Sequence, residues 1–309
     1  TGYHTHSILT IPLIAVDVNE LVGVAQILNR RAGPFGADCE RIATALAAQS
    51  AVAMRRSRLL ADRLELVKLQ HDLDIARKIQ AATFPTQFPQ APDWEIHGWS
   101  MPADATGGDA FDAVEIDGGA MLMVGDATGH GIGPAISVTQ VRSMLRMAVR
   151  LDAPLLDLVR ELNQQLWQDT SAMQFVTAWF GRLNTEAGTI ESLAAGHGPM
   201  LLLRADGAVE SIEADAPPLG VLETLMVDNI TMIDMHPGDL LAIPSDGIFE
   251  AMDETGEMYG VDRMVDLLRQ NGSLPLADAL ELLRADVESF RDERPAQDDR
   301  TILAVRHCT

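Results

Sequence analysis

Aspartates stand beside small or turn residues at the ends of several apolar stretches of the sequence. Four segments share this feature, namely "TGGDAFDA" (Asp109, Asp112), "VGDATGHG" (Asp126), "IPSDGIFE" (Asp246) and "AQDDRTILAV" (Asp298, Asp299). One such aspartate is most often only part of a turn. Several carboxylates that converge repel one another unless a cation neutralises them, and hard divalent cations prefer oxygen ligands. The four segments together predict a site for Mg²⁺ or Mn²⁺.

The segment "GDATGHGIGPA", residues 125–135, has four glycines and directly follows the apolar run "AMLMV". Glycine allows close approach of the backbone to a ligand because it has no side chain. From the residues alone, this loop is a phosphate cradle, part of a metal site or a simple turn. It also resembles the "DxGxG" box of histidine-kinase-like ATPases, but the sequence has neither the asparagine-bearing helix nor the second glycine-rich box of that family.

The elements that must position these acids lie between residue 94 and the end of the chain. "DAVEIDGGAMLMVGD" predicts two strands joined by a turn, and the segments after residue 134 predict two helices and then a run of antiparallel strands. "GDLLAIPSDGIFEA" predicts a buried strand that ends in an acid, and two helices and a last strand follow. Because the order is not a repeated βαβ alternation, we expect an α+β fold with an antiparallel sheet core and helices outside.

The residues before this region predict fewer elements and a smaller hydrophobic core. Residues 1–53 indicate two strands, joined as a hairpin, and a helix, which is too little for a complete core. From residue 51 to 83 the sequence is helical, and Val52, Leu59, Leu66 and Leu73 recur every seven residues, with Leu69 and Ala76 at a second seam position. This pattern predicts a parallel coiled coil, and the alternative is an amphipathic helix lying on its own domain. Three prolines in "FPTQFPQAPDW" then end the helix.

Composition excludes several classes of function. The 309 residues carry a formal net charge of −22, which argues against nucleic-acid binding but not against a phosphoprotein substrate, because bound cations can reverse the local charge. Cys39 and Cys308 have no paired spacing, so neither a disulfide framework nor a thiolate metal site is expected. No apolar run is long enough to span a membrane and no signal peptide is evident, so we expect a cytoplasmic protein.

Five ordered motifs carry a resemblance to a known family. "GGDAFD", "GDATGHG", "AGHGP", "SDGIFEA" and "QDDRTILAV" resemble the PPM-type (PP2C-like) serine/threonine phosphatases, and most closely the bacterial SpoIIE/RsbU subfamily, which dephosphorylates anti-sigma-factor antagonists. "ARKIQAATFP" resembles the helix that introduces this subfamily. Residues 1–53 resemble, more weakly, the C-terminal part of a GAF sensor domain. The resemblance implies an antiparallel β-sandwich flanked by helices over residues 90–309, preceded by a helical coiled-coil linker over 54–84.

The resemblance also implies a centre of two or more Mn²⁺ or Mg²⁺ ions that activates a water molecule. Carried over to this sequence, the catalytic acids are Asp109, Asp126, Asp246 and Asp298, and the metal ligands are these four with the Ala127 carbonyl and, as the alternative within its pair, Asp299. Asp298 is favoured because it occupies the first position of the motif. The glycines of the 125–135 loop then give backbone room beside Asp126, and His130 is a bystander.

Two features of the eukaryotic-type phosphatases are missing. Thr128 stands where those enzymes have a histidine, and no phosphate-binding arginine precedes Asp109, so no general acid is assigned. His197 in "AGHGP" is either a site residue or a structural histidine in a turn.

The sequence thus predicts a metal-dependent phosphatase of phosphoserine and phosphothreonine in a regulatory protein. The resemblance implies a STAS-type anti-sigma-factor antagonist as the substrate and control by an upstream sensor. The seam over residues 52–76 predicts a homodimer. The alternative is a catalytically weak or inactive PPM-fold module that binds a signalling partner, although such a module is expected to have lost its metal-binding acids.

Overall fold

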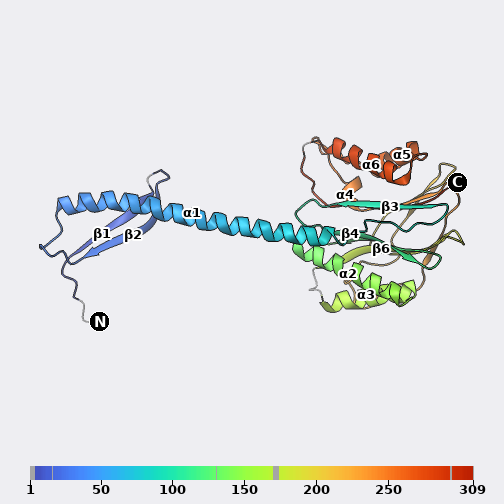
Figure 1. The fold of residues 1–309 in the computed structure, drawn as a ribbon, viewed down its shortest axis with the longest axis horizontal. Coiled ribbons are helices and arrows are strands. Elements are labelled where there is room, and N and C mark those ends of the chain that lie inside the picture. Colours follow the sequence, from blue (N-terminus) through green and yellow to red (C-terminus); the bar gives the residue numbers. More distant parts are fainter. Residues whose placement is uncertain (1–3, 16, 130, 170–173, 293, 309) are drawn as a thin grey trace. The chain divides into compact units, whose positions relative to one another are not determined.

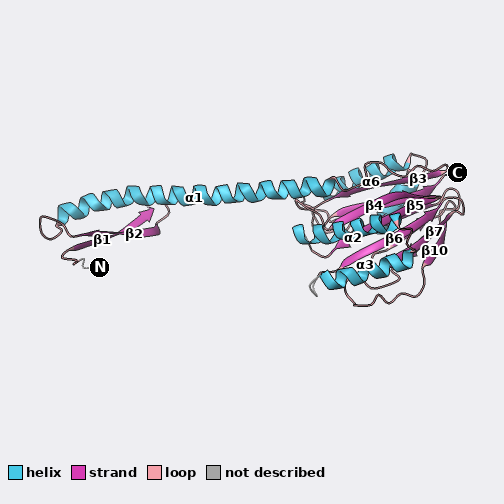
Figure 2. Ribbon diagram, turned by 60° about the horizontal axis from the view of Figure 1, so that its bottom comes forward, coloured by secondary structure: helices cyan, strands magenta, loops and turns pink. Residues whose placement is uncertain are grey.

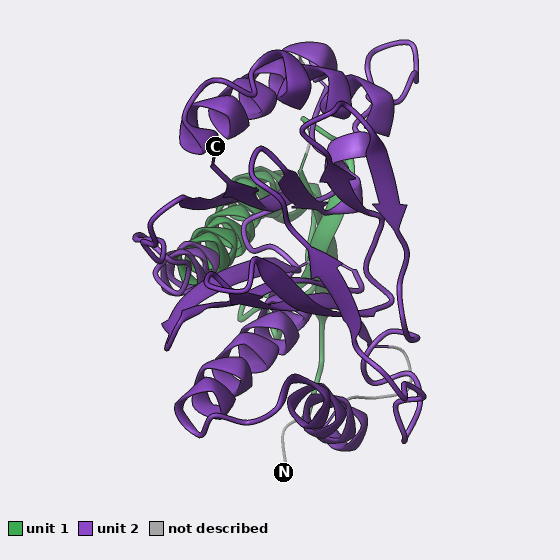
Figure 3. Ribbon diagram, turned by 90° about the vertical axis from the view of Figure 1, so that its right-hand side faces the viewer, with its two compact units in different colours: residues 1–72 green, residues 73–309 purple. Residues whose placement is uncertain are grey.

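The computed structural model describes residues 4–15, 17–129, 131–169, 174–292 and 294–308. The chain divides into two compact units, residues 1–72 and residues 73–309, which Figure 3 shows in separate colours. No helix in the described ranges has the length and apolar character needed to cross a lipid bilayer.

The first unit contains the hairpin and helix that the sequence predicts. β1 (Ile8–Ala15) pairs antiparallel with β2 (Glu20–Leu28), and α1 begins at Ala37. Alternate side chains of β1, such as Ile11 and Leu13, are buried together with Ala47 and Ala51 of α1, because successive side chains of a strand point to opposite faces.

α1 extends over Ala37–Ala81 as one helix, whereas the sequence indicated a helix within residues 1–53 and a second from residue 51. No glycine or proline interrupts these residues, so nothing in the local sequence ends the helix. Most of the predicted seam is exposed, with Leu59, Leu66 and Leu69 at 56, 61 and 56%, whereas its last two residues, Leu73 and Ala76, are half-buried.

The second unit contains two five-stranded sheets in which neighbouring strands are antiparallel (Figures 1 and 2). The first sheet has the order β10-β7-β6-β5-β4 and comprises β4 (Asp109–Ile116), β5 (Gly119–Ala127), β6 (Val176–Asn184), β7 (Thr189–Ala195) and β10 (Thr231–Asp234). The second has the order β3-β12-β11-β8-β9 and comprises β3 (Trp94–Met101), β8 (Met200–Leu203), β9 (Val209–Ile212), β11 (Leu240–Pro244) and β12 (Arg300–His307).

The sheets form the middle of a four-layered sandwich, which is visible in Figure 3. Side chains from both sheets, including Leu122, Trp179 and Ile243, make the central core. α2 (Ile132–Arg150) and α3 (Leu155–Asp169) pack on the outer side of the first sheet, and α5 (Val261–Gln270) and α6 (Leu276–Arg291) pack on the second. This arrangement confirms the expected α+β fold, an antiparallel β-sandwich flanked by helices.

Candidate active site

Asp109 and Asp126 face each other across two neighbouring strands. Asp109 is the first residue of β4 and is 2% exposed, and Asp126 lies one residue before the end of β5. The two are direct partners in the antiparallel register, which places their Cβ atoms about 5 Å apart on one face of the sheet. The register of the β4–β5 hairpin therefore determines that these two acids lie side by side.

The second pair of acids comes from the other sheet. Asp246 opens the one-turn helix α4 (Asp246–Phe249) directly after β11, and Asp298 precedes β12. The Ser245 amide donates to the Thr301 carbonyl at 2.7 Å, and the Thr301 amide donates to the Ser245 hydroxyl at 2.9 Å. A Cβ atom at residue 247 would lie only 2.0 Å from the Asp299 carbonyl oxygen, so glycine is required for this approach.

The two pairs share one electrostatic environment. Burial and the negative charges of Asp246, Asp298 and Asp299 raise the pKa of Asp126 to about 7. Burial and the charges of Asp126 and Asp299 raise the pKa of Asp109 well above its usual range, although the hydroxyls of Thr301 and Ser245 oppose this shift. The pKa of Asp246 is also raised, by desolvation and by Asp298 and Glu250. Acids from both sheets therefore act on one another, as the strand-end pattern predicted.

This group of carboxylates is suited to hard divalent cations. Asp109 Oδ2 is buried without a hydrogen-bond partner, which leaves an acceptor that a cation can satisfy. The Ala127 carbonyl oxygen lies 2.6 Å from where a Cβ of residue 108 would stand, so Gly108 leaves the backbone room beside it. Among the described residues, no three acidic, histidine or cysteine side chains are grouped as a bound ion requires. The acids therefore match such ions in chemistry, and ion binding requires their side chains to turn to a common point.

Asp298 and Asp299 differ in their surroundings although they are neighbours in the chain. Asp299 is 7% exposed, and its Oδ1 accepts a hydrogen bond from the Ala103 amide at 2.6 Å. Its Oδ2 accepts from the Gly108 amide at 2.5 Å and from the Asp109 amide at 3.3 Å. Asp299 thus holds the loop that carries Asp109, whereas Asp298 is exposed to solvent.

Gln80, in the last turns of α1, holds the same loop from the other side. Its Nε2 donates to the Gly107 carbonyl at 2.6 Å, and its Oε1 accepts from the Gly107 amide at 3.1 Å. The side chain is 9% exposed. Sequence reasoning did not identify this residue, although it lies inside the "ARKIQAATFP" motif that carried part of the resemblance. The contact ties the end of α1 to the backbone immediately before Asp109.

One strand-end acid lies apart from the group. Asp112 is fully buried and forms ion pairs with Arg142 at 3.1 Å and with Arg146 at 2.5 Å, both from α2. It joins β4 to the outer helix layer, because a buried carboxylate needs such partners.

The remaining candidate residues also have local partners. Thr128 donates its hydroxyl to the Phe175 carbonyl at 3.0 Å. His197 is 4% exposed, its Nδ1 lies 3.4 Å from the Thr177 hydroxyl, its Nε2 is buried without a hydrogen-bond partner, and burial lowers its pKa to about 4. His130 lies outside the described residues.

Comparison with known families gives a match over most of the second unit. The model of the family described as Stage II sporulation protein E (SpoIIE) matches residues 116–307. This range includes Asp126, Asp246 and Asp298.

Two curated relatives are similar at the level of sequence. The protein IcfG of Synechocystis is 25% identical over 264 residues, which cover 76% of this chain and 41% of that protein. The phosphoserine phosphatase RsbP of Bacillus subtilis is 24% identical over 243 residues, which cover 76% of this chain and 58% of that protein. The chain thus spans about half the length of these relatives.

Solved structures share the fold. The SiaA-PP2C domain of Pseudomonas aeruginosa has a TM-score of 0.68 at 23% identity and covers 78% of this chain and 98% of that one. The structure of RsbX in complex with magnesium has a TM-score of 0.55 at 14% identity and covers 71% of this chain and 98% of that one. The sandwich of the second unit is therefore a PP2C-type phosphatase fold.

The raised pKa of Asp126 makes stability depend on pH in a defined direction. Between the ordinary value of 3.8 and about 7, the folded chain keeps a proton on Asp126 that the unfolded chain releases, so this group lowers stability as pH rises. In chelator, the Asp126→Asn variant is expected to be more stable than the parent at pH 7, and the difference should vanish near pH 4. Urea unfolding at the two pH values measures this.

A control of opposite sign is Asp253→Asn. Hydrogen bonds from Thr255 and Glu257 lower the pKa of Asp253, so its removal should cost stability at pH 7 and less at pH 4. Equal effects of Asp126→Asn at both pH values would show that folding does not raise the pKa of Asp126.

Proposed function

We propose, on the premise that this chain belongs to the SpoIIE family and has the PP2C-type phosphatase fold, that it is a metal-dependent phosphatase of phosphoserine and phosphothreonine in a protein substrate. The observation that carries the proposal is the convergence of acids from both sheets, which, together with burial, raises the pKa of Asp126 to about 7. Such a group of acids is retained at a cost in stability, which an ion-binding function explains.

The proposed ligands are the carboxylates of Asp109, Asp126, Asp246 and Asp298 with the carbonyl of Ala127, and the ions are Mn²⁺ or Mg²⁺. Bound divalent cations supply an activated water molecule and offset charge on the phosphoryl oxygens. Asp298 is preferred to Asp299 because both oxygens of Asp299 already accept backbone amides.

The chain itself then contributes position and an acceptor. Asp299 and Gln80 fix the backbone on both sides of Gly108, which keeps Asp109 directly opposite Asp126. The unpartnered Oδ2 of Asp109 is the acceptor that a bound cation would satisfy.

The proposed substrate is a phosphorylated regulatory protein, of which a STAS-type anti-sigma-factor antagonist is the specific candidate. The relative RsbP is named a phosphoserine phosphatase, which supports the residue class but not a particular substrate. The alternative is a catalytically weak or inactive PPM-fold module that binds a signalling partner. The presence of every predicted metal-binding acid speaks against it.

We also propose the domain organisation and control that the sequence predicts, with a GAF-like segment over residues 1–53, a linker over 54–84 and the phosphatase over 90–309. The exposed leucines of the linker support a homodimer through the seam over residues 52–76. The hydrogen bonds of Gln80 to Gly107 support regulation of the site through the end of α1.

Asp246→Asn tests the metal-dependent activity. Loss of one carboxylate should lower the rate of phosphate release from a phosphoserine peptide with saturating Mn²⁺ on the order of 10²–10³-fold, because the charge that holds the ions is reduced. Asp266→Asn, at an exposed position of α5, is the matched control and should retain the parent rate. Full activity of Asp246→Asn would contradict the ligand assignment, and an inactive parent would favour the binding module.

The Leu59→Glu/Leu66→Glu double variant tests the seam. Light scattering at micromolar concentration should give a dimer for the parent and a monomer for the variant, because acidic side chains at facing seam positions repel. Leu64 is 70% exposed and lies off the seam, so Leu64→Glu should remain dimeric. A monomeric parent would exclude this interface.

Gln80→Ala tests the link between α1 and the site. Hydrogen exchange at the backbone amides of residues 107–109 should become faster, since two hydrogen bonds to Gly107 are lost, and phosphatase activity should fall about tenfold. Gln90→Ala removes an exposed side chain that donates to the Phe88 carbonyl and is the control. Unchanged exchange in Gln80→Ala would show that α1 does not hold this loop.

A further inference from the structure

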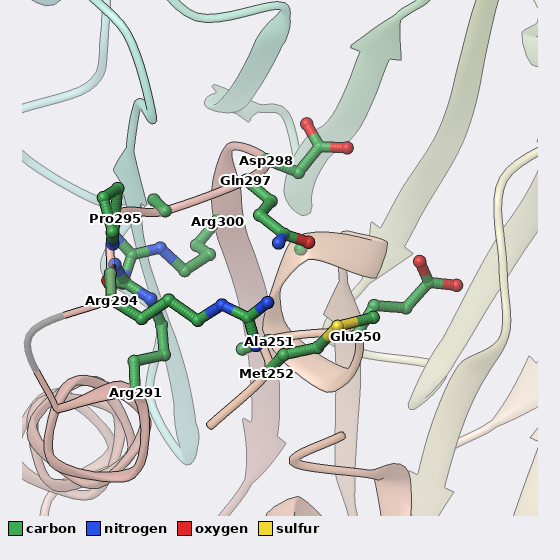
Figure 4. Close-up of a pocket in the computed structure, with 11 residues that line it drawn as sticks. Glu250, Ala251, Met252, Arg291, Arg294, Pro295, Gln297, Asp298 and Arg300 are labelled. Carbon is green, nitrogen blue, oxygen red and sulfur yellow. Dashed lines mark hydrogen bonds between the residues drawn. The ribbon is translucent and has the colours of Figure 1, made fainter. Parts of the chain in front are cut away.

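A small cavity beside Asp298 gathers three arginines. It has a volume of about 110 Å³ and lies where α4, the end of α6 and the segment before β12 meet (Figure 4). Arg291, Arg294 and Arg300 line it, together with Glu250 and Asp298 on its rim. In a chain of net charge −22, this local concentration of cations is unusual and lies next to one of the proposed metal-binding acids.

Two of the arginines are buried and share one carboxylate. Arg291 and Arg300 are 7 and 5% exposed. Arg291 pairs with Glu288 at 3.0 Å, and Arg300 pairs with the other oxygen of Glu288. Two buried guanidinium groups thus share the single carboxylate of Glu288.

The third arginine and one nitrogen of Arg300 also lack an anionic partner. Arg294 is half-buried, its Nη1 donates to the Asp253 carbonyl at 2.6 Å, and it forms no ion pair with a carboxylate among the described residues. Arg300 Nε is buried without a hydrogen-bond partner. Figure 4 shows the carboxylates of Glu250 and Asp298 pointing away from the arginine side chains. Among the described residues, Arg300 Nε therefore lacks an acceptor and Arg294 lacks a carboxylate partner.

We propose that this cavity is an anion subsite that binds the carboxylate of an acidic residue next to the phosphorylated residue of the protein substrate. The proposal rests on the proposed phosphatase function and deepens it, because it assigns a substrate class with acidic residues flanking the phosphoserine. Asp298 borders both the acid group and the cavity, so a substrate with its phosphate at the acids can place a neighbouring side chain among the arginines. Guanidinium groups suit carboxylate oxygens through paired hydrogen bonds.

Arg294→Gln is the variant of choice because Arg294 is only half-buried and belongs to no buried ion pair. Two phosphoserine peptides are compared on the full chain with Mn²⁺, one with aspartates on both sides of the phosphoserine and one with alanines there. The parent should have a lower KM for the acidic peptide, and Arg294→Gln should raise that KM about tenfold while the KM of the neutral peptide is unchanged. An equal change for both peptides, or none, would overturn the proposal.

Arg160→Gln is the matched control, because Arg160 on α3 also donates to a single backbone carbonyl, that of Val227 at 2.8 Å. It should leave both KM values at the parent level. A change like that of Arg294→Gln would assign the effect to net charge rather than to the cavity and would contradict the proposal.

A measurement of peptide binding without catalysis tests the anion subsite independently of the proposed phosphatase activity. Fluorescence anisotropy of the labelled acidic peptide is measured in chelator, with inorganic phosphate as competitor. Binding about tenfold weaker in Arg294→Gln than in the parent supports the subsite even if the chain has no phosphatase activity. Equal binding by parent and variant, or displacement of the peptide by phosphate alone at low concentration, would overturn a carboxylate subsite.

Discussion

The second unit brings carboxylates at the ends of several strands close together although these groups repel one another. Burial, together with the charges of Asp246, Asp298 and Asp299, raises the pKa of Asp126 to about 7. The fold forces these groups together, since Asp109 and Asp126 are register partners and the segment after β11 lies against the segment before β12. The folded chain thus contains unfavourable electrostatics at one place, and the proposed cations would relieve them.

Chemically identical side chains have different tasks here because their surroundings differ. Asp112 is neutralised by two arginines of α2 and joins a strand to a helix. Asp299 accepts three backbone amides and shapes the loop before β4. In contrast, Asp109 has an unpartnered Oδ2, and Asp246 and Asp298 are exposed to solvent. Residue type alone therefore does not separate an anchoring aspartate from a candidate ligand.

Much of the fold and the acid group followed from local patterns in the sequence. Alternation of apolar residues and Asp-Gly turns located β4, β5 and β11, and the acids stand at their ends as expected. The short β10 was not identified, because four residues give little periodicity, and β3 was missed although its buried residues alternate along the strand. Gln80 was also missed, since its partner Gly107 lies 27 residues away and a glutamine in a helix gives no local signal. The GAF-like segment and the coiled-coil dimer stay predictions.

The tight contact at residue 247 has a consequence for how the protein tolerates change. With the Asp299 carbonyl 2.0 Å from the position of a Cβ atom, an alanine there forces α4 away from the start of β12. A chain with alanine at residue 247 keeps every acidic residue, but its Asp246 is expected to lie farther from Asp298. The acid group therefore depends on a residue that bears no charge, and Gly247 is as necessary to its geometry as the aspartates.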